Sequence, residues 1–414
     1  MSGWPVSVNI ACVFVLPAVL FLGMSVPALP VVQASPTPTR VAPRDSRKTC
    51  LSGQEMDDLL AQVSSLLEQS RFADAAALLQ PKAQGRCDFR SDLLLAAAFD
   101  GEGDTASAER TLQQALALWP SNTSLATSLA RDELQAGDVP AARRAIAQCR
   151  PTEQTPQREL RMIAMVYLEN HELPRAAEVA QLAWHADPSQ ENLLFAANVL
   201  QLEGRYLDVV SLLEKHRGEY GDSVGFLVTM GESESDGKLY AAAERDLKRA
   251  IALDPRSYPA HYVLGNLLVT TGDLATGTAE YQKAIAINPQ QPRTYYQLGR
   301  ALEQQNDIEQ AQRYFQQAIA VDAQYAPAYA EMGKLELRAN QLQGAVDNLT
   351  RAIQSNPASQ ESYYLLVQAY GRLGQREKAQ AVMQQWTAYK KEHPLLPAPS
   401  RSDSPNALPS SPQP

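Results

Sequence analysis

The segment Ala260–Pro289, AHYVLGNLLVTTGDLATGTAEYQKAIAINP, has an amphipathic pattern on each side of Gly272. Apolar residues three and four positions apart predict two helices joined by a tight turn at this glycine. Gly265 in the first helix and Gly277 in the second are small, as expected where two helix backbones approach closely. Pro289 lacks the amide hydrogen that a further helical turn needs, so it ends the second helix. The segment therefore predicts one helical hairpin.

The same arrangement recurs along most of the chain. The helix-ending positions lie 34 residues apart, with one step of 33: Pro120, Gln154, Pro188, Gly221, Pro255, Pro289, Ala323 and Pro357. Counting the copies in this register predicts ten helical hairpins between about Met56 and Lys391. The small residue late in the second helix is replaced in three copies, by Lys82, His216 and Trp386.

This skeleton of Leu-Gly, Ala, aromatic, Ala and Pro resembles the tetratricopeptide repeat, over roughly four-fifths of the chain. The resemblance implies an all-α fold, a right-handed superhelical solenoid of about ten helix-turn-helix repeats. It also implies that the first helices of successive hairpins line the concave side. We expect the solenoid to span residues 50–393, with the best-matching repeats in 224–393.

Composition excludes one broad class of function. The chain has 414 residues, 45% of them hydrophobic and 7% aromatic, and a net charge of −9. An acidic protein does not offer a broad basic face, so nucleic acid is not an expected partner. The acidic balance itself mainly favours solubility.

The first 39 residues contain no charged side chain, and Val6–Leu22 is almost wholly apolar. Val32-Gln33-Ala34 is a small-residue cleavage site, which favours a signal peptide over residues 1–34. Arg40 and the three basic residues after it follow the apolar core instead of preceding it, which leaves a retained membrane anchor as the alternative. We expect an extracytoplasmic protein, periplasmic or secreted, or else a membrane-anchored one.

Two further segments are too rich in proline and small polar residues to form a core. Residues 35–49 predict a linker, and residues 394–414 a disordered Pro/Ser-rich tail.

Two of the cysteines flank the first hairpin. Cys50 precedes its first helix and Cys87 stands at its helix-ending position, so both belong at one pole of an antiparallel hairpin. In an oxidising compartment this predicts a disulfide between them; the alternative is two unrelated thiols. Cys149 occupies a small-residue position late in a second helix, where we expect a buried structural thiol.

Sequence signals for catalysis are weak. Gly221–Gly225 fits Gly-x-Ser-x-Gly, but that motif requires a strand before Ser223 and a helix after it. Here it falls between two helical hairpins. The five histidines show no metal-ligand spacing. We therefore expect no catalytic residue, no metal and no cofactor.

The remaining candidate for a functional site is the surface of the repeats. Polar and aromatic residues bracket the small residues of the C-terminal first helices, where the resemblance places the concave groove: Tyr262, Asn266, Tyr296, Gln297, Arg300, Lys334, Arg338, Tyr364, Gln368 and Arg372. Tyrosines, amides and cations predict a site for an extended protein or peptide partner with acidic groups or a free C-terminus. The alternative is a solvated polar face with no ligand.

The sequence thus favours a non-catalytic protein–protein interaction scaffold of an exported or envelope-associated complex. A membrane-anchored or surface adaptor for a secretion or polysaccharide machine is the alternative. A serine hydrolase using Ser223 is a remote third.

Overall fold

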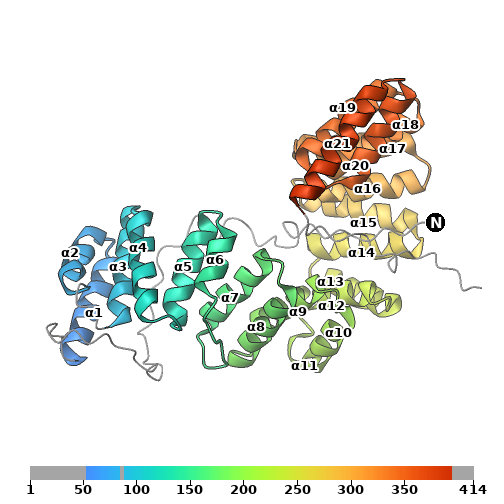
Figure 1. Ribbon diagram of the computed structural model, residues 1–414. Helices are drawn as coiled ribbons and strands as arrows, with labels where there is room; N and C mark the ends of the chain where they lie inside the picture. The colour runs from blue at the N-terminus through green and yellow to red at the C-terminus, as the bar shows by residue number, and fades with distance from the viewer. Residues whose placement is uncertain (1–52, 84–87, 394–414) are drawn as a thin grey trace, which may run out of the picture. The chain divides into compact units, whose positions relative to one another are not determined.

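The computed structural model describes residues 53–83 and 88–393, with the side chains of residues 81–83 excepted. The predicted signal segment, linker and tail, together with Cys50 and Cys87, lie outside the described residues. Within them the chain forms 21 helices and no strand (Figure 1).

Twenty of these helices form ten consecutive pairs, and the all-α repeat fold predicted from the sequence is confirmed. The first helices are α1 (Gly53–Glu68), α3 (Phe89–Glu102), α5 (Thr123–Gln135), α7 (Gln157–Glu169), α9 (Gln190–Leu202), α12 (Val224–Asp236), α14 (Tyr258–Thr271), α16 (Pro292–Gln304), α18 (Ala326–Arg338) and α20 (Gln360–Arg372). The second helices are α2 (Phe72–Ala83), α4 (Thr105–Leu118), α6 (Val139–Ala145), α8 (Leu173–Ala186), α10 (Tyr206–Lys215), α13 (Tyr240–Leu253), α15 (Leu274–Ile287), α17 (Ile308–Val321), α19 (Leu342–Ser355) and α21 (Arg376–Glu392). The remaining helix is α11 (Arg217–Tyr220).

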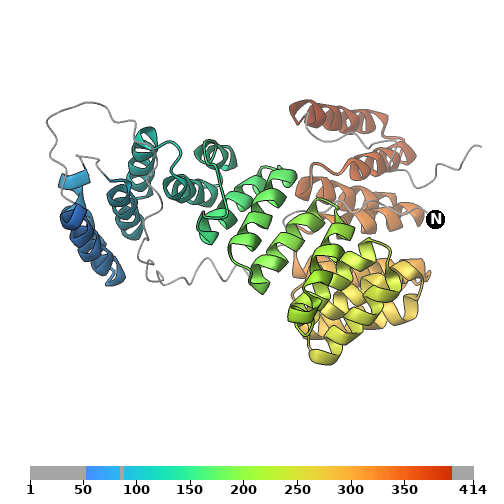
Figure 2. The same cartoon turned by 90° about the horizontal axis from the view of Figure 1, so that it is seen from below.

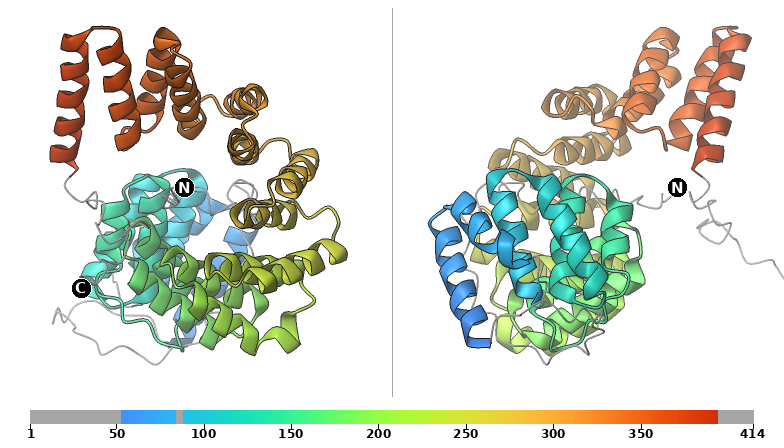
Figure 3. Two further views of the ribbon diagram at one scale, coloured as in Figure 1. Left: turned by 90° about the vertical axis from the view of Figure 1, so that its right-hand side faces the viewer. Right: turned by 60° about the vertical axis from the view of Figure 1, so that its left-hand side comes forward.

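The helices group into two compact units that divide within α10, after Val209. We call the described residues up to 209 the N-terminal unit and residues 210–393 the C-terminal unit. In nine of the ten pairs, all except α9 with α10, the first helix packs antiparallel on its own second helix, as Figures 2 and 3 show in the blue-green and the orange-red pairs.

Every pair has the same backbone conformation in the turn between its two helices. One residue in each turn between first and second helix has a left-handed conformation: Ser70, Gly103, Gly137, His171, Gly204, Lys238, Gly272, Asn306, Asn340 and Gly374. A left-handed residue ends the first helix and turns the chain back beside it. Gly272, with φ of 95°, adopts it without a side-chain penalty, whereas a residue with a Cβ pays about 1–2 kcal/mol. The turn at Gly272 predicted from the sequence is therefore confirmed.

Small residues allow the two helices of a pair to meet. A Cβ on Gly265 would lie 2.7 Å from Cδ1 of Tyr281, and one on Gly299 would lie 2.6 Å from Cε1 of Phe315. Tyr281 and Phe315 are themselves buried, so these rings fill the space that the glycines leave. Close packing of this kind explains the Leu-Gly spacing in the sequence.

Two second helices are shorter than the repeat predicts. α10 ends at Lys215, one residue before His216, which takes the place of a small residue; the extra helix α11 follows. Arg217 of α11 is held by Asp246 of α13, with Nη2 2.7 Å from Oδ2. α6 ends at Ala145, so Cys149 does not lie in a helix as predicted. Cys149 is nevertheless a buried free thiol, and burial raises its pKa to about 11.

The last pair has its own core. Trp386 of α21 stands where most of the other second helices have a small residue, and only 3% of its surface is exposed. Its ring lies 5.1 Å from that of Tyr363 and 5.9 Å from that of Tyr389, centroid to centroid. The large ring thus packs against α20 and against the end of α21 itself.

Candidate partner-binding face

The candidate site is the row of side chains that five consecutive first helices present away from their second helices. We call it the first-helix face; it is carried by α12, α14, α16, α18 and α20 of the C-terminal unit. The same position on each helix, the one after Gly231, Gly265, Gly299, Gly333 and Val367, is held by Glu232, Asn266, Arg300, Lys334 and Gln368. The 34-residue period gives these side chains the same register position in successive pairs.

Tyr262 does not offer the contact area that the sequence predicted for it. It is buried, with 6% of its surface exposed. Its ring stacks on Tyr258 at 5.9 Å and lies 6.0 Å from the ring of Tyr281. The guanidinium of Arg293 covers it from α16, 5.3 Å from the ring centre. Tyr262 is therefore part of the core under the face.

Two of the amide side chains on the face are partly engaged within the protein. Asn266 Oδ1 accepts a hydrogen bond from the Tyr281 hydroxyl at 2.6 Å, which ties the face to the second helix of the same pair. Asn266 and Gln297 are both half-buried.

Tyr296 and Arg300 form the centre of the face. The Tyr296 ring packs between Phe315 and Tyr325, at centroid distances of 5.9 and 5.8 Å. Arg300 lies over the same ring at 5.9 Å. Burial raises the pKa of Tyr296 to about 12, so its hydroxyl stays protonated at neutral pH. A protonated phenol next to a guanidinium can donate to a carboxylate together with it.

Lys334 is balanced by acidic residues that the sequence pattern did not reveal. Its Nζ lies 2.6 Å from Oε2 of Glu331, one turn earlier on α18. Burial, and then Glu331, raise the pKa of Glu361 on α20, while Lys334 and Arg300 oppose the shift. These carboxylates flank the residues chosen from the sequence, so searching the same helix faces for acids as well as cations would have found them.

Arg338 and Arg372 serve as links between neighbouring repeats. Arg338 Nη1 lies 2.5 Å from Glu303 Oε1 of α16. Arg372 donates to the Leu337 carbonyl at 2.5 Å and to Asn340 Oδ1 at 2.7 Å, at the end of the preceding first helix. Both guanidinium groups are thus engaged within the unit.

The part of the face on α20 is exposed to solvent. Tyr364 on α20 has 47% of its surface exposed, and Gln368, one turn later, is also exposed. Among the predicted site residues, these two retain the greatest freedom to meet a partner.

Ser223 has a structural role. It is the N-cap of α12, and its Oγ accepts a hydrogen bond from the amide of Phe226 at 3.5 Å. It follows helix α11, not a strand. A nucleophile elbow needs a strand in that place. The Gly-x-Ser-x-Gly match is accounted for by helix capping.

One buried hydrogen bond between a histidine and a glutamate was not predicted from the sequence. His261 Nδ1 lies 2.6 Å from Glu280 Oε2, and His261 Nε2 lies 3.1 Å from the carbonyl oxygen of Pro255. The Lys283 ammonium and His261 together lower the pKa of Glu280 against the opposing effect of burial. A carbonyl oxygen only accepts, so Nε2 is the donor to Pro255 and the ring is fixed in orientation.

The described residues contain no group of three or more side chains suited to holding a metal ion. None of their helices combines the length and the apolarity needed to span a bilayer. A cavity of about 290 Å³ lies among α4, α5 and α6, and it contains none of the predicted site residues.

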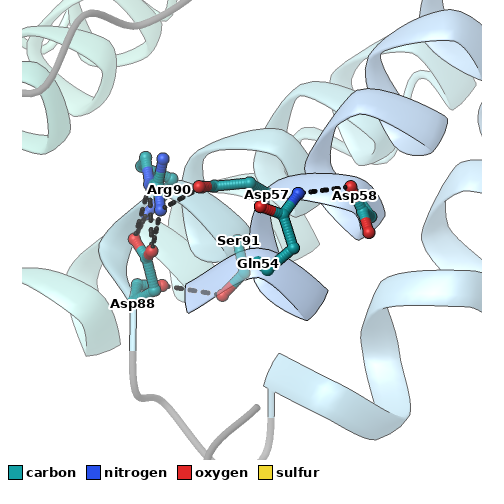
Figure 4. Close-up of polar contacts among 6 residues, drawn as sticks. All are labelled: Gln54, Asp57, Asp58, Asp88, Arg90 and Ser91. Atoms are coloured by element: carbon teal, nitrogen blue, oxygen red, sulfur yellow. Dashed lines mark hydrogen bonds and ion pairs between the residues drawn. The ribbon is translucent and has the colours of Figure 1, made fainter. Parts of the chain in front are cut away.

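Figure 4 shows the polar contacts of the first pair. Arg90 in α3 lies 2.9 Å from Asp57 of α1 and 2.6 Å from Asp88, the N-cap of α3. These contacts hold the beginning of α1 beside the beginning of α3. The described residues nearest in sequence to Cys50 and Cys87 are Gly53 and Asp88.

Comparison with family models gives four matches, all to the same repeat. A model described as TPR repeat matches residues 265–306, and models described as tetratricopeptide repeat match residues 93–153, 292–325 and 336–396. The chain is a tetratricopeptide-repeat protein. Three of the four matches fall in the C-terminal unit, where the repeat skeleton is most regular. No curated protein matches the chain.

Solved structures are also similar, at low sequence identity. A structure of the MamA protein is 21% identical with a TM-score of 0.38, covering 43% of this chain and 98% of that one. The APC/C hetero-tetramer Cut9–Hcn1 is 14% identical with a TM-score of 0.37, covering 82% and 88%. YrrB, described as a TPR protein with an unusual peptide-binding site, is 19% identical with a TM-score of 0.35, covering 44% and 93%.

Proposed function

We propose that the protein is a non-catalytic scaffold that binds an extended peptide segment of a partner along the first-helix face of the C-terminal unit. The row of large polar side chains on five successive first helices supports this proposal. Proteins with this repeat generally mediate protein–protein contacts. The structural role of Ser223 favours a scaffold over a hydrolase.

Within this proposal, a carboxylate or free C-terminus of the partner binds at Arg300. This guanidinium forms no ion pair within 4 Å with any residue that the structure describes, and Tyr296 lies beside it. Lys334 would contribute by exchanging Glu331 for the partner's carboxylate. Charge-assisted hydrogen bonds of this kind contribute about 1.5–3 kcal/mol.

The double change Arg300→Ala with Lys334→Ala tests the proposal. It should abolish capture of the partner, since losing even one such contact weakens binding about tenfold. The partner would be captured by affinity purification with crosslinking from the native host. A matched control is Lys283→Ala with Arg313→Ala, which removes the same charge from the exposed second helices α15 and α17. Equal loss of capture in both variants would place the site elsewhere.

We also propose that the protein works outside the cytoplasm, as part of an exported or envelope complex. Residues 1–34 would act as the signal peptide, and the adaptor for a secretion or polysaccharide machine is the alternative if they are retained as an anchor. Fractionation of the expressing cells and the mass of the mature N-terminus distinguish the two. A cytoplasmic protein that begins at Met1 would exclude both.

A further inference from the structure

The cavity of about 290 Å³ in the N-terminal unit lies where three consecutive helices meet. α4 packs on α5, and α5 packs on α6. α6 has only seven residues, whereas α4 has 14, and α6 lines the cavity with Ala141 and Ala145. These two residues lie one turn apart on the same side of the helix, and their small side chains leave space beside it. The volume is close to the lower limit for small-molecule sites, which range from about 300 to 1,000 Å³.

All three helices line the cavity with aliphatic side chains. Leu116 comes from α4 and Leu129 from α5, and they join the two alanines of α6. Leu129 and Ala141 are buried, whereas Leu116 and Ala145 are half-buried and keep part of their surface in contact with water. An apolar group in the cavity would cover this remaining surface, which is favourable because apolar surface is removed from water.

The same cavity is lined by one acid and one base. Glu133 follows Leu129 by one turn on α5, and Arg144 lies in the last turn of α6. The two side chains form no ion pair within 4 Å and no hydrogen bond, either with each other or with any other residue that the structure describes. The neighbouring Arg143, in contrast, pairs with Glu172 of α8. The cavity therefore carries two opposite charges, neither of which is engaged within the described residues.

Glu133 has more acidic than basic neighbours. Burial raises its pKa, and Glu109 and Asp138 raise it further, while Arg144 opposes the shift. Arg144 is thus near enough to act on Glu133 across the cavity, although the two do not form an ion pair. A ligand cation at Glu133 would offset the repulsion from the other two acids.

We propose that this cavity binds a free α-amino acid with an apolar side chain, with leucine as the type ligand. The ammonium group of the ligand binds Glu133, its carboxylate binds Arg144, and its side chain packs on the aliphatic residues. An amino acid supplies all three groups in one small molecule, and both of its polar contacts are charge-assisted. The site lies within the N-terminal unit and goes beyond the peptide binding proposed for the C-terminal unit.

Ligand-observed NMR titrations of the full chain test the apolar part of the site. The probes are L-leucine, L-methionine, L-phenylalanine and glycine. We expect the three apolar amino acids to bind. Glycine should bind at least about tenfold more weakly than leucine, because it has no side chain to cover the aliphatic residues.

Two relatives of leucine test the charges without adding bulk. Isocaproic acid is leucine without the ammonium group, and isoamylamine is leucine without the carboxylate. Each should bind at least about tenfold more weakly than leucine, because each loses one charge-assisted contact. Binding of either compound as tight as that of leucine would contradict the role of the missing group.

Two variants assign each charge of the ligand to one residue. Glu133→Gln should lower the affinity for leucine about tenfold and leave isocaproic acid unchanged, since that compound has no ammonium group to lose. Arg144→Gln should lower the affinity for leucine equally and leave isoamylamine unchanged. The control Glu68→Gln with Arg158→Gln removes the same charges from exposed positions on α1 and α7, and it should leave leucine binding unchanged.

A third variant tests the cavity while keeping both charges. Ala145→Leu places a longer side chain in the space that the ligand would occupy, so it should abolish leucine binding. Because Ala145 is half-buried beside this space, the variant should retain the melting temperature of the wild type. Ala117→Leu, at an exposed position on α4, is the matched control and should bind leucine normally.

Several outcomes would overturn the proposal. They are the absence of saturable binding by any amino acid, equal binding of glycine and leucine, and leucine binding that survives both Glu133→Gln and Ala145→Leu. A loss of leucine binding that is equal in the variants and in their controls would also overturn it. None of these outcomes bears on peptide capture by the first-helix face, so the two proposals can fail independently.

Discussion

The two units build the same helix pair from different residues. At the contact between first and second helix, the C-terminal unit has glycine in four successive pairs, and the N-terminal unit has alanine: Gly231, Gly265, Gly299 and Gly333 against Ala96, Ala130, Ala164 and Ala197. The second helix compensates in several pairs. The residues at the position of Tyr281 and Phe315 are Leu112 in α4 and Ala180 in α8, and all four are buried. Leu247 and Leu349 hold this position opposite Gly231 and Gly333, so only the pairs of Gly265 and Gly299 combine the glycine with a large ring.

Polar residues link neighbouring first helices in both units. Arg161 pairs with Glu191 and Ser124 donates to Glu159 in the N-terminal unit, and Arg338 pairs with Glu303 in the C-terminal unit. In the C-terminal unit, Glu232, Asp236 and Arg300 form no ion pair within 4 Å among the described residues. Polar groups already paired within a unit have less to gain from a partner, which favours the C-terminal unit as the binding part.

The largest effect should come from blocking the packing of a second helix. Ala318→Arg and Ala115→Arg each force a cation into a fully buried position, at equivalent places in the two units. Each should destabilise its own unit by about 3–5 kcal/mol, through overpacking and the burial of charge. Limited proteolysis followed by mass spectrometry would show which unit is lost. Ala320→Arg, on the exposed side of the same helix as Ala318, is the control and should have little effect.

If both substitutions unfold the entire chain together, the division into two units has no energetic meaning.

The next effect concerns only the N-terminal unit. We predict a disulfide between Cys50 and Cys87, which would stabilise the first pair by about 2–4 kcal/mol. Mass mapping of non-reduced peptides checks the bond, and Cys149 should appear as the free thiol. Cys50→Ser should lower the first unfolding transition by the same amount as reduction. Finding Cys50 and Cys87 both alkylated without reductant would refute the bond and weaken the case for export.

The next prediction exchanges glycine and alanine at the contact between first and second helix. Gly265→Ala should destabilise the C-terminal unit by about 2 kcal/mol, because the added methyl group meets Tyr281. Ala96→Gly should cost the N-terminal unit about 1 kcal/mol, mostly in helix propensity. Gly371→Ala is the control, since no neighbouring atom lies within 4 Å of the place its methyl group would take, and it should stabilise α20 slightly.

Denaturant unfolding would measure all three; a stabilising Gly265→Ala would mean that the pair can open without cost.

The smallest effect should be a dependence on pH. Glu234 is buried near Arg217 and Asp246, and burial raises its pKa to about 7. Because this folded-state pKa lies above the value of an unfolded glutamate, the stability that it contributes is present in acid and is lost as the pH rises through about 7. Glu234→Gln should therefore stabilise the C-terminal unit by about 1 kcal/mol at pH 8 and leave it unchanged at pH 4.

Asp100→Asn provides the N-terminal counterpart, with its transition near pH 6. Thermal melts across this pH range would test both; a constant difference between Glu234→Gln and the wild type would contradict the assignment.

The repeat could be predicted from the sequence because every pair repeats the same local requirements. The left-handed turn at Gly272 and the small residue at Gly265 each follow from backbone geometry within one hairpin. The early ends of α6 and α10 were not predicted, because the period continues through Cys149 and His216 although the helices do not.

The composition of the candidate site was harder to predict, because it depends on pairs between neighbouring repeats. Arg372 reaches back to Leu337, and Arg338 to Glu303, about one period away in sequence. A pattern read one hairpin at a time identifies such residues as surface cations and cannot show that they are engaged. The burial of Tyr262 has the same origin, because Arg293 covers it from the next first helix.

The tryptophan at the small-residue position of the last pair has a consequence for lengthening the array. Copies of a repeat can in principle be added one after another like monomers to a polymer, since each presents the surface that the next one needs. Trp386, stacked on Tyr389 and tilted against Tyr363, places a large aromatic ring at this position. We expect it to act as a chain terminator, so that an engineered eleventh pair would dock in register only after Trp386 is replaced by alanine.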